Sequence, residues 1–192
     1  DPEKAKQPIL GANDGASGVA VLLELMRAVK GKLPEGLGVM YLMVDGEDLG
    51  PDLEEMFLGA IHFSKNLPDP KPDYGILLDM IGDKDLVIPM EPNSVAMARP
   101  LMQAFYRHAA SVGLKSTFPQ TYGPEILDDH LSINEAGIPT IDLIDFKYGP
   151  GHAYWHTLQD VPANCSADSL GKVGKALESW LLKTPVWEYP KP

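Results

Sequence analysis

The sequence predicts an α/β fold built on a mainly parallel sheet. Short, continuous apolar runs alternate with longer amphipathic stretches along the chain. The apolar runs lack the polar–apolar alternation of strands that expose one face to water, so we expect them to be covered on both faces. Buried strands separated by helices are typical of parallel sheets. The length of 192 residues fits a single domain, which we expect to span 1–192.

The first expected element is a helix over 14–30. Its apolar positions recur at steps of three and four residues and form the predicted inner face: Val19, Leu22, Leu23, Met26 and Val29. Asn13 or Asp14 is the expected N-cap, and Gly31 is the expected stop.

Four runs are expected as strands. Residues 37–44 are continuously apolar and predict a strand covered on both faces. Residues 74–80 predict a second buried strand and 85–88 a short third one. A fourth covers 138–144, after the turn at Ala136-Gly137.

Further helices are expected over 54–65 and 94–112, and a short one begins near Asp128-Asp129. Ser166 is the expected cap of a final helix. The inner face of the second long helix comprises Leu101, Phe105, Ala109 and Val112, and that of the final helix Leu170, Val173, Leu177 and Leu181. The tail from 184 to 192 holds three prolines and is expected on the surface.

Composition excludes several classes of function. The net charge is −11, from 27 acidic and 16 basic residues, which argues against a nucleic-acid partner. No apolar run approaches the ~20 residues that a membrane-spanning helix needs. Cys165 is the single cysteine, so no internal disulfide can form. The chain starts at Asp1 without a methionine, and we expect an incomplete N-terminus.

Acidic and imidazole groups stand where several expected strands or their loops end. These groups are Asp14, the pair Glu47-Asp48, Asp79 and His156. In open α/β sheets, ligands bind beyond the carboxyl ends of the strands. Carboxylates with one imidazole suit zinc that keeps an open position for chemistry. The sequence therefore predicts one zinc site at this edge.

Each group also has a simpler interpretation. Asp14 can act as an N-cap, and Glu47-Asp48 can form a solvated acidic turn. Neighbouring side chains in an extended loop point to opposite sides, so one acid of the pair can hold metal while the other carries a proton. Asp79 interrupts an apolar strand end and needs a partner there. Capping explains one acid of Asp128-Asp129, but not both acids together with the histidine that follows.

Two rival chemistries find little support. The stretch Gly15-Ala16-Ser17-Gly18 lacks the Gly-x-Ser-x-Gly pattern of serine hydrolases. The glycine-rich loop also lacks the Gly-Lys-Ser/Thr and Gly-x-Gly-x-x-Gly patterns that bind phosphates.

Five motifs in order resemble a known family. They occupy residues 11–18, 45–48, 77–82, 128–130 and 155–157. Together they resemble the zinc family shared by glutaminyl cyclases and bacterial leucyl-type aminopeptidases, over about residues 8 to 183. The resemblance implies a single zinc-dependent catalytic domain. Its fold would be a three-layer sandwich, with helices on both faces of a mainly parallel central sheet.

The resemblance also implies roles for individual residues. The implied zinc ligands are Asp14, Asp48 and His156. Glu47 is similar to the general acid/base. Asp79 is similar to a residue that holds a second metal in the aminopeptidases and joins a carboxylate network in the cyclases. Asp128 resembles the other acid of that network, and Trp155 resembles part of the substrate pocket.

The chain departs from the family pattern in two ways. Many members have two glutamates where this chain has Glu47-Asp48. The aminopeptidases carry a His-x-Asp motif upstream of the Asp14 loop, whereas no histidine precedes Asp14 here. The resemblance therefore implies either an N-terminally shortened chain or a second metal site that lacks a ligand.

Three functions follow as hypotheses. The leading one is a zinc-dependent glutaminyl-peptide cyclotransferase, which forms N-terminal pyroglutamate and releases ammonia. The second is a zinc aminopeptidase, for which a second zinc ion is expected. The third is a catalytically silent zinc-binding domain on the same scaffold. The expected partner is a peptide or peptide-like substrate with a free N-terminus. Resemblance to exported proteins favours a periplasmic or secreted location, and the oligomeric state is not indicated.

Overall fold

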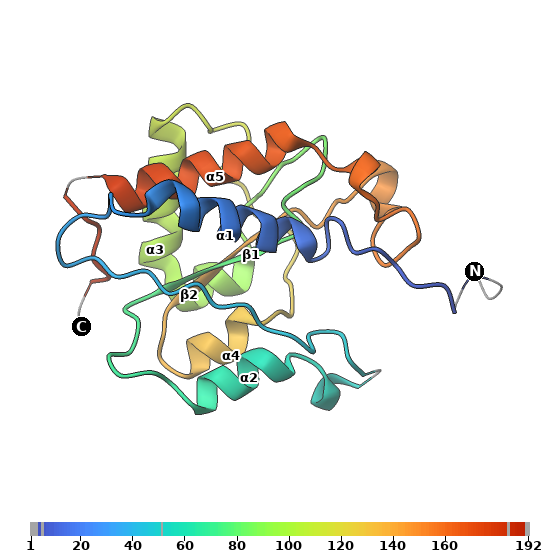
Figure 1. Ribbon diagram of the computed structural model, residues 1–192, viewed down its shortest axis with the longest axis horizontal. Helices are drawn as coiled ribbons and strands as arrows, with labels where there is room; N and C mark the ends of the chain where they lie inside the picture. Colours follow the sequence, from blue (N-terminus) through green and yellow to red (C-terminus); the bar gives the residue numbers. More distant parts are fainter. Residues whose placement is uncertain (1–3, 5, 51, 184, 191–192) are drawn as a thin grey trace.

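The structure, a computed structural model, describes residues 4, 6–50, 52–183 and 185–190. Its helices are α1 (Ala16–Val29), α2 (Leu58–Lys65), α3 (Pro92–Ser111), α4 (His130–Glu135) and α5 (Ala167–Leu182). Its strands are β1 (Gly75–Asp79) and β2 (Thr140–Ile144), and short 3-10 turns lie at Leu53–Glu55, Pro150–His152 and Pro162–Asn164. Figure 1 shows the strands lying between the pair α1 and α5 and the pair α2 and α4. The predicted α/β class, with helices on both sides of a parallel sheet, is confirmed.

The sheet is parallel, as the apolar runs predict. β1 and β2 pair from Gly75 with Thr140 to Asp79 with Ile144. All five residues of β2 are buried, as expected for a strand covered on both faces. This register brings the carboxyl end of β1, which carries Asp79, to the same edge as the loop that follows β2.

Two predicted strands are absent from the described residues. Residues 37–44 form no strand, because no described segment pairs with their backbone. Apolar composition predicts a buried environment, but a ladder also needs a partner strand. Residues 85–88 form no strand either. Their backbone makes isolated hydrogen bonds, such as the one from Ile88 N to Thr117 O (2.7 Å), instead of a ladder.

Helix α1 forms where predicted but buries a different face. Of the predicted inner residues, Val29 is buried, but Val19, Leu23 and Met26 are 41–54% exposed. Val21 and Leu25 are buried in their place. The reason is a close contact at Gly18, where a Cβ atom would lie 2.4 Å from the Leu78 carbonyl oxygen. The close packing of Gly18 on β1 sets the rotation of the helix. A count of apolar residues in the sequence cannot detect this contact.

The predicted N-cap of α1 is also wrong. Gly15 occupies the cap position, and no side chain caps the helix. The Asn13 side chain accepts a hydrogen bond from Gly82 N (2.6 Å) instead, so it ties the loop before α1 to the loop after β1. The predicted stop holds, because the helix ends at Val29 and Gly31 adopts a positive φ of 72°.

The main core lies among α1, α3, α5 and the sheet. Phe105 meets both Phe118 and Trp180 edge to face, with ring centroids 5.7 and 5.6 Å apart. The predicted inner faces of α3 and α5 are confirmed: Leu101, Phe105, Ala109, Val173 and Leu177 are buried. The tail differs from the prediction, because Trp187 and Tyr189 pack against this core. Among the described residues, no helix has the length and apolar character to cross a membrane.

Candidate metal centre

All seven predicted site residues line one pocket of about 270 Å³. They come from the loop before α1, the loop before α2, the end of β1, the loop before α4 and the loop after β2. Their side chains are Asp14, Glu47, Asp48, Asp79, Asp128, Trp155 and His156. The carboxyl ends of the strands thus gather the acidic groups at one edge, as the parallel topology predicts.

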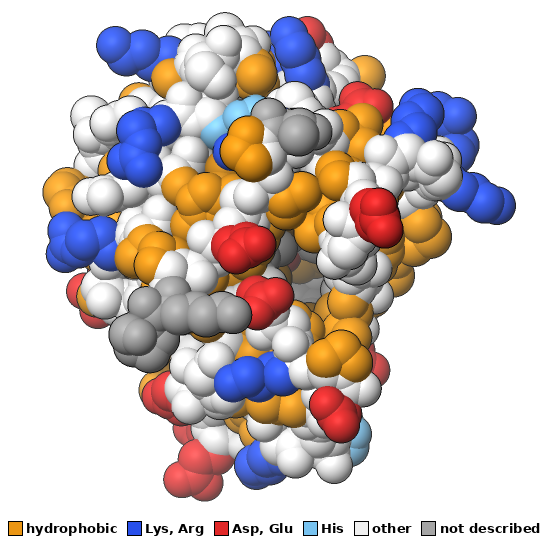
Figure 2. All heavy atoms as spheres, turned by 90° about the vertical axis from the view of Figure 1, so that its left-hand side faces the viewer, with side chains coloured by type: hydrophobic (Ala, Val, Ile, Leu, Met, Phe, Trp, Pro, Cys, Tyr) orange, Lys and Arg blue, Asp and Glu red, His pale blue; other side chains and the backbone are white. Residues whose placement is uncertain are grey.

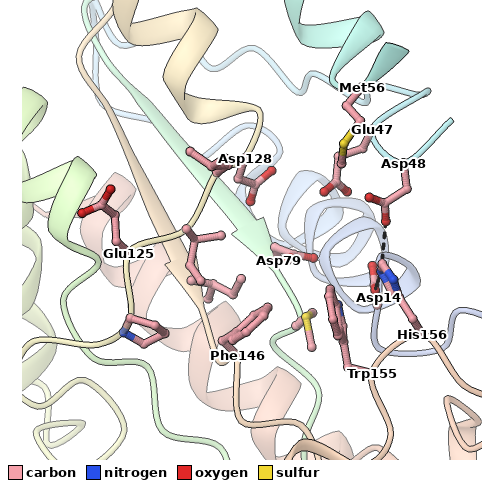
Figure 3. A pocket seen from close by; sticks show the side chains of 15 residues that line it. Asp14, Glu47, Asp48, Met56, Asp79, Glu125, Asp128, Phe146, Trp155 and His156 are labelled. Carbon is pink, nitrogen blue, oxygen red and sulfur yellow. Dashed lines mark ion pairs between the residues drawn. The ribbon is translucent and has the colours of Figure 1, made fainter. Parts of the chain in front are cut away.

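Three of these side chains converge on a common point. His156 Nε2 lies 3.2 Å from Asp14 Oδ2 and 3.0 Å from Asp48 Oδ2. One potential ligand atom from each residue lies within 4.8 Å of the other two. Figure 3 shows both carboxylates directed at the imidazole ring, while Glu47 points away from it toward Asp79 and Asp128. The adjacent acids 47 and 48 therefore face different parts of the pocket.

The loop that carries Asp14 is held by an acid from the far end of the chain. Asp160 is buried and accepts hydrogen bonds from Asn13 N (2.7 Å) and Asp14 N (3.2 Å). Tyr148 Oη donates to the same carboxylate (2.9 Å). Asp160 was not predicted as a site residue, because its partners lie 146 and 147 positions away and no local motif marks it.

The loop that carries Glu47 and Asp48 is anchored to the start of α2. The carbonyl oxygens of residues 45, 46 and 47 accept from the backbone N–H groups of Gly59, Leu58 and Phe57, at 2.9–3.1 Å. These donors belong to the first turn of the helix, where N–H groups lack intrahelical partners. A Cβ atom at Gly59 would lie 2.6 Å from Asp45 N, so the close approach requires glycine.

The acids beside the candidate metal ligands hold protons more tightly than usual. Burial, and next the charge of Asp128, raises the pKa of Glu47 to about 8. Burial also raises the pKa of Asp79 well above its usual range, with further contributions from Asp128, Asp14 and Glu47. Several carboxylates with little solvent cannot all ionise at once. At neutral pH this cluster therefore retains protons on some of its members.

A second, deeper layer of charged groups lies behind Asp128. Asp128, His130 and Asp142 are all buried, and their potential ligand atoms also lie within 4.8 Å of one another. His130 Nε2 lies 3.3 Å from Glu91 Oε2, and Glu91 accepts from the backbone N–H of Asn93 at 2.8 Å. Sequence patterns do not mark Glu91 or Asp142, because each sits within an otherwise ordinary cap or strand.

Burial raises the pKa of Asp128 to about 6, of Asp129 to about 7, and of Asp142 well above its usual range. The proton held by Asp142 can serve Asp128, whose Oδ2 otherwise lacks a partner among the described groups. These buried groups thereby hold the carboxylate of Asp128 in place at the pocket surface.

An aromatic wall closes the other side of the pocket. Trp155 stacks on His156 with ring centroids 4.0 Å apart and meets Phe146 edge to face at 5.2 Å. Met56, Ile126 and Leu127 complete the apolar lining and were not predicted, because apolar loop residues carry no motif. The pocket thus combines an acidic side with an apolar side.

The three converging side chains fit a zinc ion. Two carboxylate oxygens and one imidazole nitrogen are ordinary zinc donors, and three protein ligands leave a coordination position open for chemistry. His156 and Asp48 are 41% and 43% exposed, so an ion can reach them from solvent. Glu47 belongs to neither of the two groups of potential ligands among the described residues, and remains free to handle protons.

Known proteins share this arrangement of the chain. The structure resembles glutaminyl cyclase from Bacteroides thetaiotaomicron bound to N-acetylhistamine, with a TM-score of 0.87 and 36% identity, covering 95% of this chain and 66% of that one. It also resembles a Zn-dependent exopeptidase from Parabacteroides distasonis, with a TM-score of 0.86 and 31% identity, covering 95% and 67%. The chain is 25% identical to bovine glutaminyl-peptide cyclotransferase over 209 residues, or 91% of this chain, but spans only 56% of that enzyme's length.

A family model described as peptidase family M28 matches residues 2–181, which is nearly the whole chain. This match, the fold and the gathered carboxylates agree with the resemblance carried by the five motifs. Zinc is the metal named for the related exopeptidase and suits the donor set here. The chain therefore belongs to peptidase family M28.

Proposed function

We propose that this chain is the catalytic part of a glutaminyl-peptide cyclotransferase, which converts an N-terminal glutamine into pyroglutamate and releases ammonia. One observation carries the choice. Among the described residues, Asp79 belongs to neither group of potential metal ligands, whereas Asp14, Asp48 and His156 form one. A single zinc ion held by this group would leave Asp79 to act with Glu47 and Asp128. One metal and a separate proton carrier are what cyclisation requires.

A zinc ion held by Asp14, Asp48 and His156 would act as a Lewis acid that polarises the side-chain amide of the substrate. Glu47 accepts a proton from the substrate's α-amine as the amine nitrogen bonds to the amide carbon. It then returns the proton to the departing nitrogen, and the carbon–nitrogen bond to the leaving group breaks to give ammonia. Burial and neighbouring acids raise the pKa of Glu47 to about 8 in the metal-free chain, and a nearby zinc ion would lower it toward neutrality, where a group can both take and return a proton.

The pocket suits both the amino group and the side chain of an N-terminal glutamine. The acidic side attracts the amino terminus of a peptide. The apolar side, with Phe146 and Trp155, packs against the methylene groups of a glutamine side chain. A volume of about 270 Å³ admits one side chain rather than a long peptide. The rest of the peptide would extend into solvent from the mouth of the pocket.

The test is ammonia release from a glutaminyl peptide by the zinc-loaded chain, with the matching glutamyl peptide as the control substrate. We expect ammonia and a cyclised product from the first and no ammonia from the second. Bound zinc with no ammonia release from the glutaminyl peptide would overturn the proposal.

The second candidate is an aminopeptidase, favoured by the similarity to the Zn-dependent exopeptidase and by the carboxylate of Asp79 that lines the pocket. Glu47 would then deprotonate water for attack on the first peptide bond. A metal count near two per chain together with cleavage of a leucyl substrate would favour this function. Zinc binding without turnover of either substrate would favour a catalytically silent domain.

A further inference from the structure

A group of four contacting aromatic rings ends on His156, the imidazole of the candidate zinc ligands. Trp155 stacks on His156 with ring centroids 4.0 Å apart and planes tilted by 24°. His152 stacks on Trp155 at 4.9 Å and 28°, and Phe146 contacts His152 at 4.4 Å. In Figure 3 the ring of Trp155 stands beside His156, on the side toward Phe146. His152 alone among the four does not line the zinc pocket, so it can act on that pocket only through its neighbours.

Trp155 is held between two imidazole rings. It stacks on both His152 and His156, whereas these two rings make no contact with each other in the described part of the chain. The two imidazoles therefore pack on different sides of the indole. Phe146 meets the same indole edge to face at 5.2 Å, which limits its rotation further.

His156 lacks the hydrogen bond that usually orients a metal-binding histidine. Such a residue almost always donates its second ring N–H to a carboxylate, a backbone carbonyl or water. His156 Nε2 faces the carboxylates of Asp14 and Asp48, and no hydrogen bond joins its Nδ1 to any described group. The side chain is also 41% exposed, so little other packing restrains it. The stacked indole of Trp155 is therefore the contact that fixes the plane of this ring.

The loop that carries these rings is built to bring them together. His152 and His156 have positive φ angles of 68° and 52°, which residues with a side chain adopt rarely. Such conformations persist where the surrounding structure determines them. Gly149 lets the loop turn back on itself, because a Cβ atom there would lie 2.3 Å from the ring of Tyr154. The backbone N–H of Gly149 donates to the buried carboxylate of Asp83 (2.8 Å), which anchors the turn.

His152 contributes through the faces of its ring and not through its nitrogens. Both ring nitrogens are buried, and neither has a hydrogen-bond partner among the described groups. A buried nitrogen without a partner costs free energy of desolvation and returns none. What remains is the flat shape of the ring, which fills the space between Phe146 and Trp155.

We propose that His152 is a positioning residue for the metal centre. Its ring holds Trp155 against His156, and so fixes the direction in which His156 presents Nε2 to a zinc ion. Ligands held in place by surrounding packing lose less conformational freedom when the ion binds, which raises affinity. The inference rests on the proposed ligand set Asp14, Asp48 and His156, and not on which reaction the site performs.

The test measures the zinc affinity of the full 192-residue chain, freed of metal, by titration against a competing chelator. Three substitutions at one position separate the properties of the ring. His152→Ala removes it, His152→Leu keeps much of its volume without a flat face, and His152→Phe keeps a flat ring without the nitrogens. The melting temperature of each metal-free variant is measured alongside.

The matched control must lose packing away from the metal centre. Leu177 of α5 is buried and lines a separate cavity of about 670 Å³ between residues 36–44 and β1. Figure 2 shows a hollow ringed by hydrophobic side chains on the side of the molecule where these segments emerge. None of the four rings lines this cavity. We expect Leu177→Ala to lower the melting temperature and to leave zinc affinity unchanged.

We expect His152→Ala and His152→Leu to bind zinc about 10-fold or more weakly than the parent chain, which is the scale of losing an outer partner of a metal ligand. His152→Phe should stay within about threefold of the parent, since a ring of similar shape replaces the imidazole. Parent-like affinity of His152→Leu would overturn the proposal, whether or not His152→Ala folds. So would a loss in His152→Phe as large as that in His152→Leu, because the ring faces would then not be what matters.

The outcome is separable from the proposed function. Absence of ammonia release together with the expected zinc affinities would overturn the cyclase and support the role of His152. Loss of zinc in His156→Ala, with none in His152→Leu, would overturn the role of His152 alone. Parent-like zinc affinity in His156→Ala would overturn both the ligand set and this inference.

Discussion

Glu47 and Asp48 are neighbours in the chain, but the structure places their side chains in different parts of the pocket. Asp48 meets the imidazole of His156 at 3.0 Å, whereas Glu47 interacts with Asp79, Asp128 and Asp129. A carboxylate bound to metal is a poor base, so the division allows one loop to supply both a ligand and a proton carrier. The alternation of side chains along an extended loop predicts this separation from sequence.

Replacing Glu47 by glutamine tests the proton role. Glu47→Gln keeps the size of the side chain but cannot accept a proton, so we expect turnover to fall by ~10²–10⁴-fold. Zinc content should stay near that of the parent chain. The measurement is the rate of ammonia release together with metal analysis, and Glu54→Gln on the exposed turn at Leu53–Glu55 is the matched control. Full turnover of Glu47→Gln would contradict the assignment.

Replacing His156 tests the metal role. His156→Ala removes the single nitrogen donor of the converging set. We expect zinc affinity to fall by more than the ~10–100-fold that loss of an outer partner of a ligand costs. Titration with zinc against a competing chelator measures this, and His62→Ala on the exposed face of α2 is the control. If His156→Ala bound zinc as tightly as the parent, the ion would lie elsewhere.

Whether a site residue can be predicted from sequence depends on how far along the chain its contact partners lie. All seven predicted residues line one pocket because each closes a strand or opens a loop at the same sheet edge. Asp160 and Asp142 were not predicted, since their contacts join positions remote in sequence. Local motifs mark the groups that touch the pocket, but they do not mark the groups that hold those residues in place.

At the scale of elements, glycine positions decide how α1 meets the sheet. Gly18 lies against β1, with the Leu78 carbonyl oxygen 2.4 Å from where a Cβ atom would be. Gly171 in α5 has nothing within 4 Å of that position. The two glycines thus sit in similar helices but in opposite surroundings.

The same substitution at these two glycines should have opposite effects. Gly18→Ala must push α1 away from β1, and we expect a loss of about 2–3 kcal/mol in the free energy of unfolding. Gly171→Ala should raise it by about 1 kcal/mol, because alanine favours a helix without meeting a neighbour. Urea unfolding of both variants measures the difference. A neutral Gly18→Ala would mean that α1 does not pack closely on β1.

Elements were predicted best where side chains alone determine burial. The inner faces of α3 and α5 follow from apolar spacing, because large side chains pack there. The face of α1 does not, since backbone contact at Gly18 sets its rotation. Residues 37–44 have the composition of a strand, yet pairing requires a second backbone that no local pattern supplies.

At the scale of the whole molecule, the acidic cluster links stability to pH. The pKa values of Glu47, Asp129 and Asp128 are raised to about 8, 7 and 6, in each case first by burial. The unfolded chain releases these protons near pH 4 to 4.5, where ordinary carboxyl groups titrate. Between that range and pH 8, the folded chain binds more protons than the unfolded chain, so stability must fall as pH rises.

We therefore expect the metal-free chain to be more stable at pH 5 than at pH 8. The melting temperature should differ by about 4 °C or more, since each kcal/mol shifts it by roughly 2–4 °C in a chain of this size. Scanning calorimetry of the chelator-treated chain across this range measures the slope. Glu47→Gln should flatten the part of the slope near pH 8, because its side chain cannot ionise. Bound zinc should flatten it further by neutralising Asp14 and Asp48. A melting temperature that rises with pH in the metal-free chain would mean that these acids are ionised in the fold, and that the cluster does not hold protons for catalysis.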